Sequence, residues 1–312
     1  MTDAVCTKPS NRLRQLLAIT AATVLATTAA GCTNNDEDAH ALDIKTSFYP
    51  LQYLTEEIGG ENVQVHSLTP PGTDAHSLEL SPKTVTEIGN ADAVIYLSHF
   101  QSAVDEAVDQ AKPAHALDVY ETARIQPTGN KDTAANPLAG ANDPHFWLDA
   151  SRMADVATQI GDFLGKVDPD NAANYRQRAS EVADQMQALN AEMVSGLSQC
   201  ERDTFIVSHE AFGYLADQVS LKQVGVSGLD PEVAPSPERL KAISKLVKET
   251  GAKTIFTEVN VSPKVIEVLA ADLGITTDTL DPIATLNDPK KDYPTLMRED
   301  LAALQKGLEC KP

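Results

Sequence analysis

The chain has 312 residues, and its 42% of hydrophobic residues is enough for one large domain or two medium-sized ones. It carries 25 basic and 45 acidic residues, a formal net charge of −20. Nucleic-acid binding needs a basic surface, so we expect no nucleic-acid partner. The acidity suits an extracytoplasmic protein and mildly favours the approach of cations, although solubility alone explains it equally well.

The N-terminus has the layout of an export signal. A basic region precedes the apolar run 16–28, which is too short to span a bilayer, and small residues lead from it to Cys32. The segment resembles bacterial lipoprotein signals, in which the cysteine becomes the lipid-modified first residue of the mature chain. We therefore expect a signal peptide at 1–31, a lipid anchor at Cys32 and a polar tether at 32–41. An ordinary cleaved signal followed by an unrelated cysteine is the alternative.

Two of the four cysteines, Cys200 and Cys310, lie in the second half of the chain. In the oxidising compartment that an export signal implies, they are candidates for a disulfide. Their pairing would close a loop of about 110 residues and stabilise the fold by about 4–5 kcal/mol in the chain-entropy estimate. The sequence does not show whether their Cα atoms lie close enough. Because the chain has no CxxC pair, we do not expect a thiolate metal site.

The chain repeats one pattern of elements. Residues 47–57 align without a gap on 208–218, and each segment follows a short apolar run and continues with helical periodicity. In each half, a β-branched run, a helix opened by Ser-Pro and a buried apolar strand come next. The series ends in LDVY (117–120) or LDPI (280–283). Strands that alternate with helices twice over predict two α/β domains, each with a mostly parallel sheet.

A long helix is predicted between the two halves. From 174 to 197 the apolar residues recur at steps of three and four, which places them on one helix face. They are Tyr175, Ala179, Val182, Met186, Leu189, Met193 and Leu197. A helix of about 28 residues would be about 40 Å long, enough to span both domains and to limit hinge motion between them. We expect an N-terminal α/β metal-binding domain at 42–166, a linking helix at 167–199 and a C-terminal α/β metal-binding domain at 200–312.

Four potential metal ligands stand at strand ends or in loops that follow strands: His76, His145, His209 and Asp281. In open α/β sheets, ligands bind outside the carboxyl ends of the strands, so we expect two residues from each half to converge in a cleft between the domains. Three imidazoles and one carboxylate suit a tetrahedral Zn²⁺ site, whereas more carboxylate favours Mn²⁺. Because these residues lie far apart in sequence, a structural or surface role remains the alternative for each histidine.

The motifs together resemble a known family. SFYPLQYLTEEIGG, PPGTDAHSLELSP, DPHFWLD, SHEAFGYLA and LDPIA follow one another over nearly all of the predicted mature chain. Their order and spacing resemble the zinc- and manganese-binding lipoproteins that deliver metal to ABC importers. The resemblance implies that His76 and His145 are the first two ligands, and that Asp281 is the fourth ligand or lies close to the metal. It also implies a preference for zinc, because His209 stands where many manganese importers have Glu.

The same resemblance implies the partners and the location. We expect the chain to capture Zn²⁺, to be attached through lipidated Cys32 to the extracytoplasmic face of the bacterial cell membrane, and to pass the metal to an ABC permease with its ATPase. We expect a monomer. A manganese- or iron-binding importer subunit is the closest alternative. A surface adhesin, a role given to some relatives, leaves no mark in the sequence.

Two segments depart from the family pattern. Zinc importers often carry a histidine-rich loop before the second ligand, but residues 121–142 contain no histidine, which places a metal-gathering role for this loop in doubt. The segment LSHFQSAVDEAV (97–108) stands where relatives usually show a Gly and then a Glu-Trp pair, and we expect its His99 to be peripheral.

A metal-bound imidazole usually has an acceptor on its other ring nitrogen. Carboxylates near the predicted ligands or at a strand end are candidates for this role: Asp74, Glu79, Asp149, Glu210 and Glu258. For Glu210, stabilisation of the dipole of the following helix is an equal alternative.

A zinc hydrolase would use a similar ligand set with an open position for water. His209 and Glu210 begin like the HExxH motif, but Gly213 stands where that motif requires its second histidine. The chain has neither a GxSxG elbow nor a P-loop. A fourth protein ligand, Asp281, would also close the coordination of the metal. We therefore predict a binding protein and not an enzyme.

Overall fold

The computed structural model describes residues 41–127 and 141–311, which belong to one compact unit. The predicted signal peptide, the lipid anchor Cys32 and the predicted tether up to residue 40 lie outside the described residues, as does most of the histidine-free loop. In the part of the chain that is described, no helix combines the length and the apolar character needed to cross a bilayer.

The first half contains a parallel sheet of four strands in the order β2-β1-β3-β4. Ile44 of the central strand lies opposite Val65 on one side and Ala93 on the other. The elements of this half are β1 (Leu42–Thr46), α1 (Tyr49–Gly59), the 3-10 helix η1 (Gly60–Asn62), β2 (Val63–Ser67), α2 (Pro82–Asn90), β3 (Ala93–Tyr96), α3 (Ser102–Ala111) and β4 (Ala116–Asp118).

The second half contains a second parallel sheet, in the order β10-β9-β7-β8. Its elements are β7 (Thr204–Val207), α6 (Gly213–Gln218), β8 (Lys222–Gly225), α7 (Pro237–Thr250), β9 (Thr254–Glu258), α8 (Lys264–Leu273) and β10 (Thr276–Leu280). In both sheets the first strand of the half lies between the second and the third, and the fourth follows the third. The predicted repeat and the predicted α/β class are therefore confirmed.

Matching helix starts explain part of this repetition. Ser81 and Ser236 each cap a helix, with Oγ accepting the backbone N–H of Thr84 and Arg239 respectively, and a proline follows each serine. Proline at the first helical position loses no hydrogen bond, and its ring fixes a helical φ. The Ser-Pro pairs in the sequence therefore set the same turn from loop into helix in both halves.

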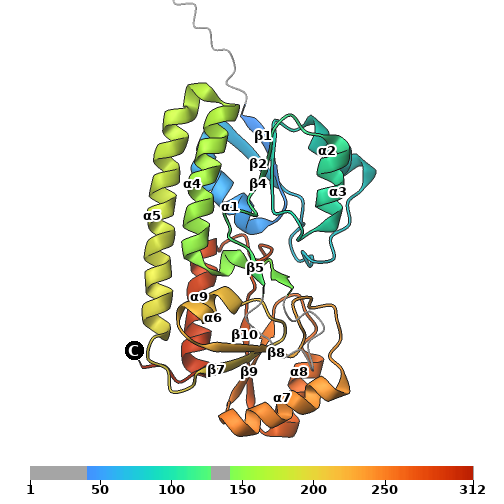
Figure 1. Ribbon diagram of the computed structural model, residues 1–312, viewed down its shortest axis with the longest axis vertical. Helices are drawn as coiled ribbons and strands as arrows, with labels where there is room; N and C mark the ends of the chain where they lie inside the picture. The colour runs from blue at the N-terminus through green and yellow to red at the C-terminus, as the bar shows by residue number, and fades with distance from the viewer. Residues whose placement is uncertain (1–40, 128–140, 312) are drawn as a thin grey trace, which may run out of the picture. The chain divides into compact units, whose positions relative to one another are not determined.

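A helical layer connects the two sheets. It contains the short ribbon of β5 (Gln126–Pro127) and β6 (Asn142–Asp143), the 3-10 helix η2 (Phe146–Leu148), α4 (Ala150–Val167), the 3-10 helix η3 (Pro169–Asn171), α5 (Ala172–Leu197) and the last helix α9 (Tyr293–Gly307). Figure 1 shows α4 and α5 side by side. Gly161 and Gly165 of α4 allow this close approach. A methyl group at Gly161 would clash with Ala179 of α5, and one at Gly165 would press against Ala172, the first residue of α5.

The long helix α5 buries the face that its periodicity predicts. Its buried residues are the seven apolar residues named from the sequence. The helix contacts α1 of the first half and α9 near the C-terminus. The observed helix begins at Ala172, and the predicted boundaries of the domains at 166 and 199 remain a prediction.

One hydrophobic core runs through both halves. It includes Ile44 of β1, Phe205 of β7 and the buried side chains of Trp147 and Tyr293. Trp147 Nε1 donates to the carbonyl of Pro282 at 2.7 Å, and the Tyr293 hydroxyl donates to the carbonyl of Trp147. Because these contacts join η2 to the loop after β10 and to α9, the ligand-bearing segments of the two halves share one support.

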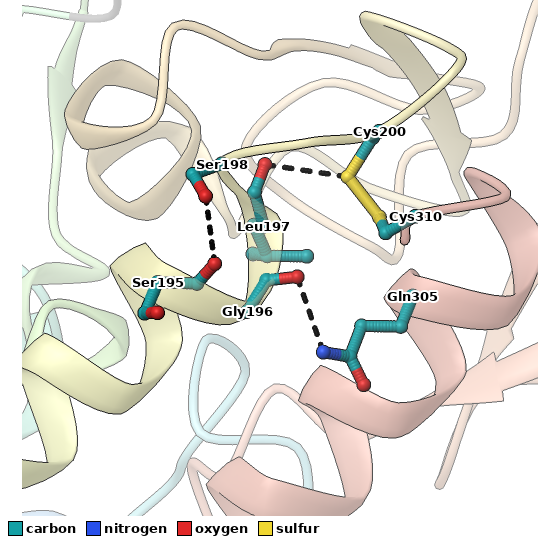
Figure 2. Close-up of a disulfide and its surroundings, with 7 residues drawn as sticks. All are labelled: Ser195, Gly196, Leu197, Ser198, Cys200, Gln305 and Cys310. Carbon is teal, nitrogen blue, oxygen red and sulfur yellow. Dashed lines mark hydrogen bonds between the residues drawn. A yellow bond between two sulfur atoms is a disulfide. The ribbon is translucent and has the colours of Figure 1, made fainter. Parts of the chain in front are cut away.

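A disulfide between Cys200 and Cys310 ties the end of α5 to the end of the chain (Figure 2). Beside it, Gln305 Nε2 donates to the carbonyl of Gly196 at 3.1 Å. Arg202 and Glu309 form an ion pair at 2.7 Å. The pairing that the sequence left open is therefore present, and Cys200 lies in the segment that leads from α5 into β7.

Removing this bond is expected to lower stability without touching the metal site. The double variant Cys200→Ala/Cys310→Ala should lose about 4–5 kcal/mol of unfolding free energy, because the denatured chain regains the entropy of an open loop. Urea unfolding of the oxidised protein and of the variant measures the difference, and reduction of the unsubstituted protein is the matched control. Equal midpoints in all three samples would contradict the prediction.

Candidate metal centre

His76 lies in the loop between β2 and α2. Its backbone N–H donates to Asp74 Oδ1 at 3.1 Å, which closes a tight turn in the PGTDAH segment. Its ring packs edge-on against Phe100, with ring centroids 4.9 Å apart and planes at 89°. The side chain thus enters the site from a loop that follows a strand end of the first sheet.

His145 follows β6 and is fully buried. Its ring Nδ1 lies 2.8 Å from Asp143 Oδ1, and the same oxygen accepts its backbone N–H at 3.0 Å. The carbonyl of Asp143 in turn accepts the hydroxyl of Tyr214 from α6 at 2.7 Å. The position of His145 is therefore fixed by a carboxylate from its own segment and by a tyrosine from the second half.

His209 follows β7, at the carboxyl end of the second sheet. Its backbone N–H donates to Glu258 Oε1 at 3.0 Å, and its ring Nδ1 is hydrogen-bonded to Glu258 Oε2. Glu258 ends β9, which is the neighbour of β7 in the sheet. Adjacent parallel strands bring their carboxyl ends together, so this register places the carboxylate beside the imidazole.

The three histidines converge on one point. His145 Nε2 lies 3.1 Å from His76 Nε2 and 3.2 Å from His209 Nε2, and the three potential ligand atoms lie within 4.8 Å of one another. In a tetrahedral zinc site with Zn–N bonds of about 2.0–2.1 Å, neighbouring nitrogens are about 3.3 Å apart. The observed spacing fits one divalent cation held between the three Nε2 atoms.

The outer hydrogen bonds favour the same conclusion. Carboxylates at Nδ1 of His145 and His209 favour the tautomer with the proton on Nδ1, which turns the lone pair of each Nε2 inward. In this tautomer the Nε2 lone pairs of His145 and His209 are free to bind a metal ion.

Burial favours the neutral form of two of the imidazoles by lowering their pKa. Burial lowers the pKa of His76 well below its usual value, and the neighbouring His145 and His209 lower it further; burial likewise lowers that of His145. For His209, burial acts in the same direction, but the charge and hydrogen bond of Glu258 outweigh it and raise the pKa. Burial raises the pKa of Asp143 to about 7. Neutral imidazoles are the form that binds a metal.

Asp281 stands apart from the three histidines. It lines the same cavity as they do, but it does not belong to the cluster of ligand atoms. Its Oδ1 accepts the backbone N–H of Ile283 at 2.8 Å, and its own N–H donates to Asp300 Oδ1 at 2.8 Å. Burial raises the pKa of Asp281 to about 6. The Asp281 carboxylate thus lies at the wall of the cavity, outside the cluster of the three histidine ligand atoms.

The five carboxylates that the sequence offered as acceptors for an imidazole have different roles in the structure. Glu258 holds His209 as the sequence suggested, whereas Asp149 caps α4 and pairs with Arg152 at 3.1 Å. Glu210 is buried beside Arg239, with 3.5 Å between Oε1 and Nη2. Glu79 is exposed, and Asp74 accepts the backbone of His76 and not its ring.

Sequence reasoning missed Asp143. Its position was visible, since Asp74 and Asp143 both stand two residues before a predicted histidine ligand. His99 is exposed and packs edge-on against Tyr120, 5.4 Å between centroids, as its predicted peripheral role requires.

Loss of the outer carboxylates is expected to weaken metal binding. Glu258→Gln and Asp143→Asn should each reduce zinc affinity about 10–100-fold, because the imidazole loses its orientation and part of its basicity. Competition titration with a zinc chelator measures the change. Asp149→Asn is the matched control: it removes a buried carboxylate that caps a helix and leaves both imidazoles untouched, so affinity should stay unchanged. An equal loss in all three variants would contradict the assignment.

Comparisons with known proteins point to one family. The ZnuA family, described as zinc-uptake complex component A, periplasmic, matches residues 44–307. The high-affinity zinc uptake system protein ZnuA of Bacillus subtilis is 29% identical over 288 residues, 88% of this chain and 90% of that protein. The zinc-binding lipoprotein AdcA of Streptococcus pneumoniae is 29% identical over 286 residues, 88% of this chain. The match covers 57% of AdcA, so the chain spans little more than half of that relative's length.

Solved structures give the same result. The AdcAII protein of Streptococcus pneumoniae has a TM-score of 0.76 and 31% identity, covering 86% of this chain and 99% of its own. The laminin-binding protein Lmb of Streptococcus agalactiae, described as bifunctional with adhesin and metal transporting activity, has a TM-score of 0.76 and 29% identity, covering 86% and 100%. Since the family match takes in most of its length, this chain belongs to the ZnuA family of periplasmic zinc-uptake components.

Proposed function

We propose that this chain is the solute-binding component of an ABC importer and that Zn²⁺ is its cargo, held by His76, His145 and His209. The observation that carries the proposal is the convergence of three Nε2 atoms, of which two belong to rings held by carboxylates at Nδ1. The donor set favours zinc over manganese, since imidazole suits zinc and carboxylate suits manganese. The names of the relatives, which describe zinc binding and zinc uptake, agree with this choice.

We assign Asp281 as the fourth donor. Its carboxylate belongs to the loop after β10, lines the cavity beside the histidines and accepts a backbone N–H through Oδ1. A fourth protein ligand closes the tetrahedron, which suits storage of a cargo ion better than activation of water. Together with membership of a zinc-uptake family, this favours a binding protein over a zinc hydrolase.

The partners and the location follow from the family. In this proposal, a lipid on Cys32 holds the chain at the extracytoplasmic face of the membrane, and the protein acts as a monomer. It passes zinc to a permease that is driven by an ATPase. Because one core runs through both halves, release requires the shift of a ligand-bearing loop and not a wide hinge opening. The adhesin alternative has no support in the described residues, and the manganese or iron importer remains the closest alternative.

Zinc stoichiometry tests the proposal directly. Residues 33–312 should bind one Zn²⁺ per chain in native mass spectrometry. His76→Ala and His209→Ala should weaken binding by more than the about 10–100-fold that loss of an outer partner costs, because each removes a metal bond. His99→Ala, which removes an exposed histidine outside the cluster, is the control and should bind as tightly as the unsubstituted chain. Affinity that is indifferent to His76 and His209 would refute the site.

The third histidine should set the choice of metal. His209→Glu replaces a nitrogen donor by a carboxylate and should move the ratio of zinc to manganese affinity towards manganese. Parallel titrations with the two ions measure that ratio. An unchanged ratio would mean that selectivity resides elsewhere in the site.

A further inference from the structure

We propose that Gln101 is the positioning residue for His76, an inference that rests on the proposed function because it assigns a role within the same zinc site. His76 differs from the other two histidines of the cluster in how its ring is held. The rings of His145 and His209 are each held at Nδ1 by a carboxylate. Among the described residues, no hydrogen-bond acceptor lies at Nδ1 of His76, whose ring is fixed by packing against Phe100.

His76 therefore depends on its backbone for its position. The loop that carries it is anchored by one buried amide: Gln101 Nε2 donates to Thr69 Oγ1 at 2.8 Å and to the carbonyl of Ala75 at 3.1 Å. Thr69 Oγ1 in turn donates to the carbonyl of Ser47 at 2.7 Å. The amide thus links the start of the loop and the residue before His76 to the carboxyl end of β1.

The same short segment also controls the ring. Phe100, which packs against the imidazole, is the residue before Gln101, and Gln101 is the N-cap residue of α3. Residues at the start of α3 therefore hold both the backbone and the ring of His76. No other histidine of the cluster is held in this way in the described part of the chain.

The energetics of Gln101 favour a role in the site over a role in the core. Its side chain is 1% exposed, and within the described residues its Oε1 has no hydrogen-bond partner. An unsatisfied buried acceptor costs stability, and an apolar side chain of the same shape would avoid that cost. The amide therefore contributes through its two donated hydrogen bonds, which fix the position of the loop at Ala75.

The test is a double-mutant cycle on zinc affinity and zinc dissociation. Gln101→Met keeps the shape and removes both donors, and it should weaken binding and speed dissociation about 10–100-fold, as loss of an outer partner does elsewhere. In the His76→Ala background the same substitution should change affinity by less than about twofold, the usual error of additivity. Gln159→Met is the matched control, because this glutamine on α4 is half-buried and also has an unpartnered oxygen; it should leave affinity unchanged.

Thr69→Val provides a second route to the same answer if Gln101→Met does not fold. It is close to isosteric and removes the other end of the anchor, so it should reproduce the loss in the unsubstituted chain and not in His76→Ala. An equal loss in both backgrounds, or no loss in either, overturns the role of Gln101 while zinc binding by the unsubstituted chain still supports the proposed function. Absence of zinc binding by the unsubstituted chain overturns the proposed function and this inference with it.

Discussion

Three imidazole nitrogens that face one another at 3.1 and 3.2 Å impose the constraint around which the site is built. Burial opposes protonation of His76 and His145, which favours the neutral form that binds a metal. The surrounding fold holds the three rings in these positions. It does so with Asp143 and Glu258 for two rings and with a backbone anchor for the third.

The architecture explains how such rigidity is obtained from loops. Each sheet places its strand ends, and the loops that follow them, at the site, and the two sheets repeat one strand order. The helix η2, directly after His145, is joined to Pro282 and Tyr293 of the other half through Trp147. Helix α5 packs along both halves. Ligands that lie far apart in sequence are thereby supported by one continuous core, which limits how far the halves can separate.

Much of this was visible in the sequence, because the relevant signals are local. The periodicity of α5 predicted each of its buried residues, and the Ser-Pro pairs predicted two helix starts. The histidines could be named because they follow strands in a repeated pattern. The role of Asp149 as a helix cap also has a local signal, since an Asp directly before a helix usually caps it, although the sequence offered it only as one of five candidate acceptors for an imidazole.

The remaining features depend on contacts that no local pattern encodes. Glu258 contacts His209 only because β9 lies beside β7. Gln101 contacts Ala75 only because the start of α3 lies against the loop that carries His76. The burial of Glu210 against Arg239 likewise follows from packing between α7 and the end of β8. Sequence spacing sets which residues are candidates, and the register of the sheet decides which of them touch.

The coordination of the bound metal tests the central claim most directly. X-ray absorption at the zinc edge, on residues 33–312 loaded with one equivalent of Zn²⁺, should show three imidazole nitrogens at about 2.0–2.1 Å together with one oxygen. In His76→Ala the imidazole contribution should fall to two. A sulfur neighbour, or an imidazole count that does not change in His76→Ala, would contradict the account, because zinc would then be bound outside the cluster of His76, His145 and His209.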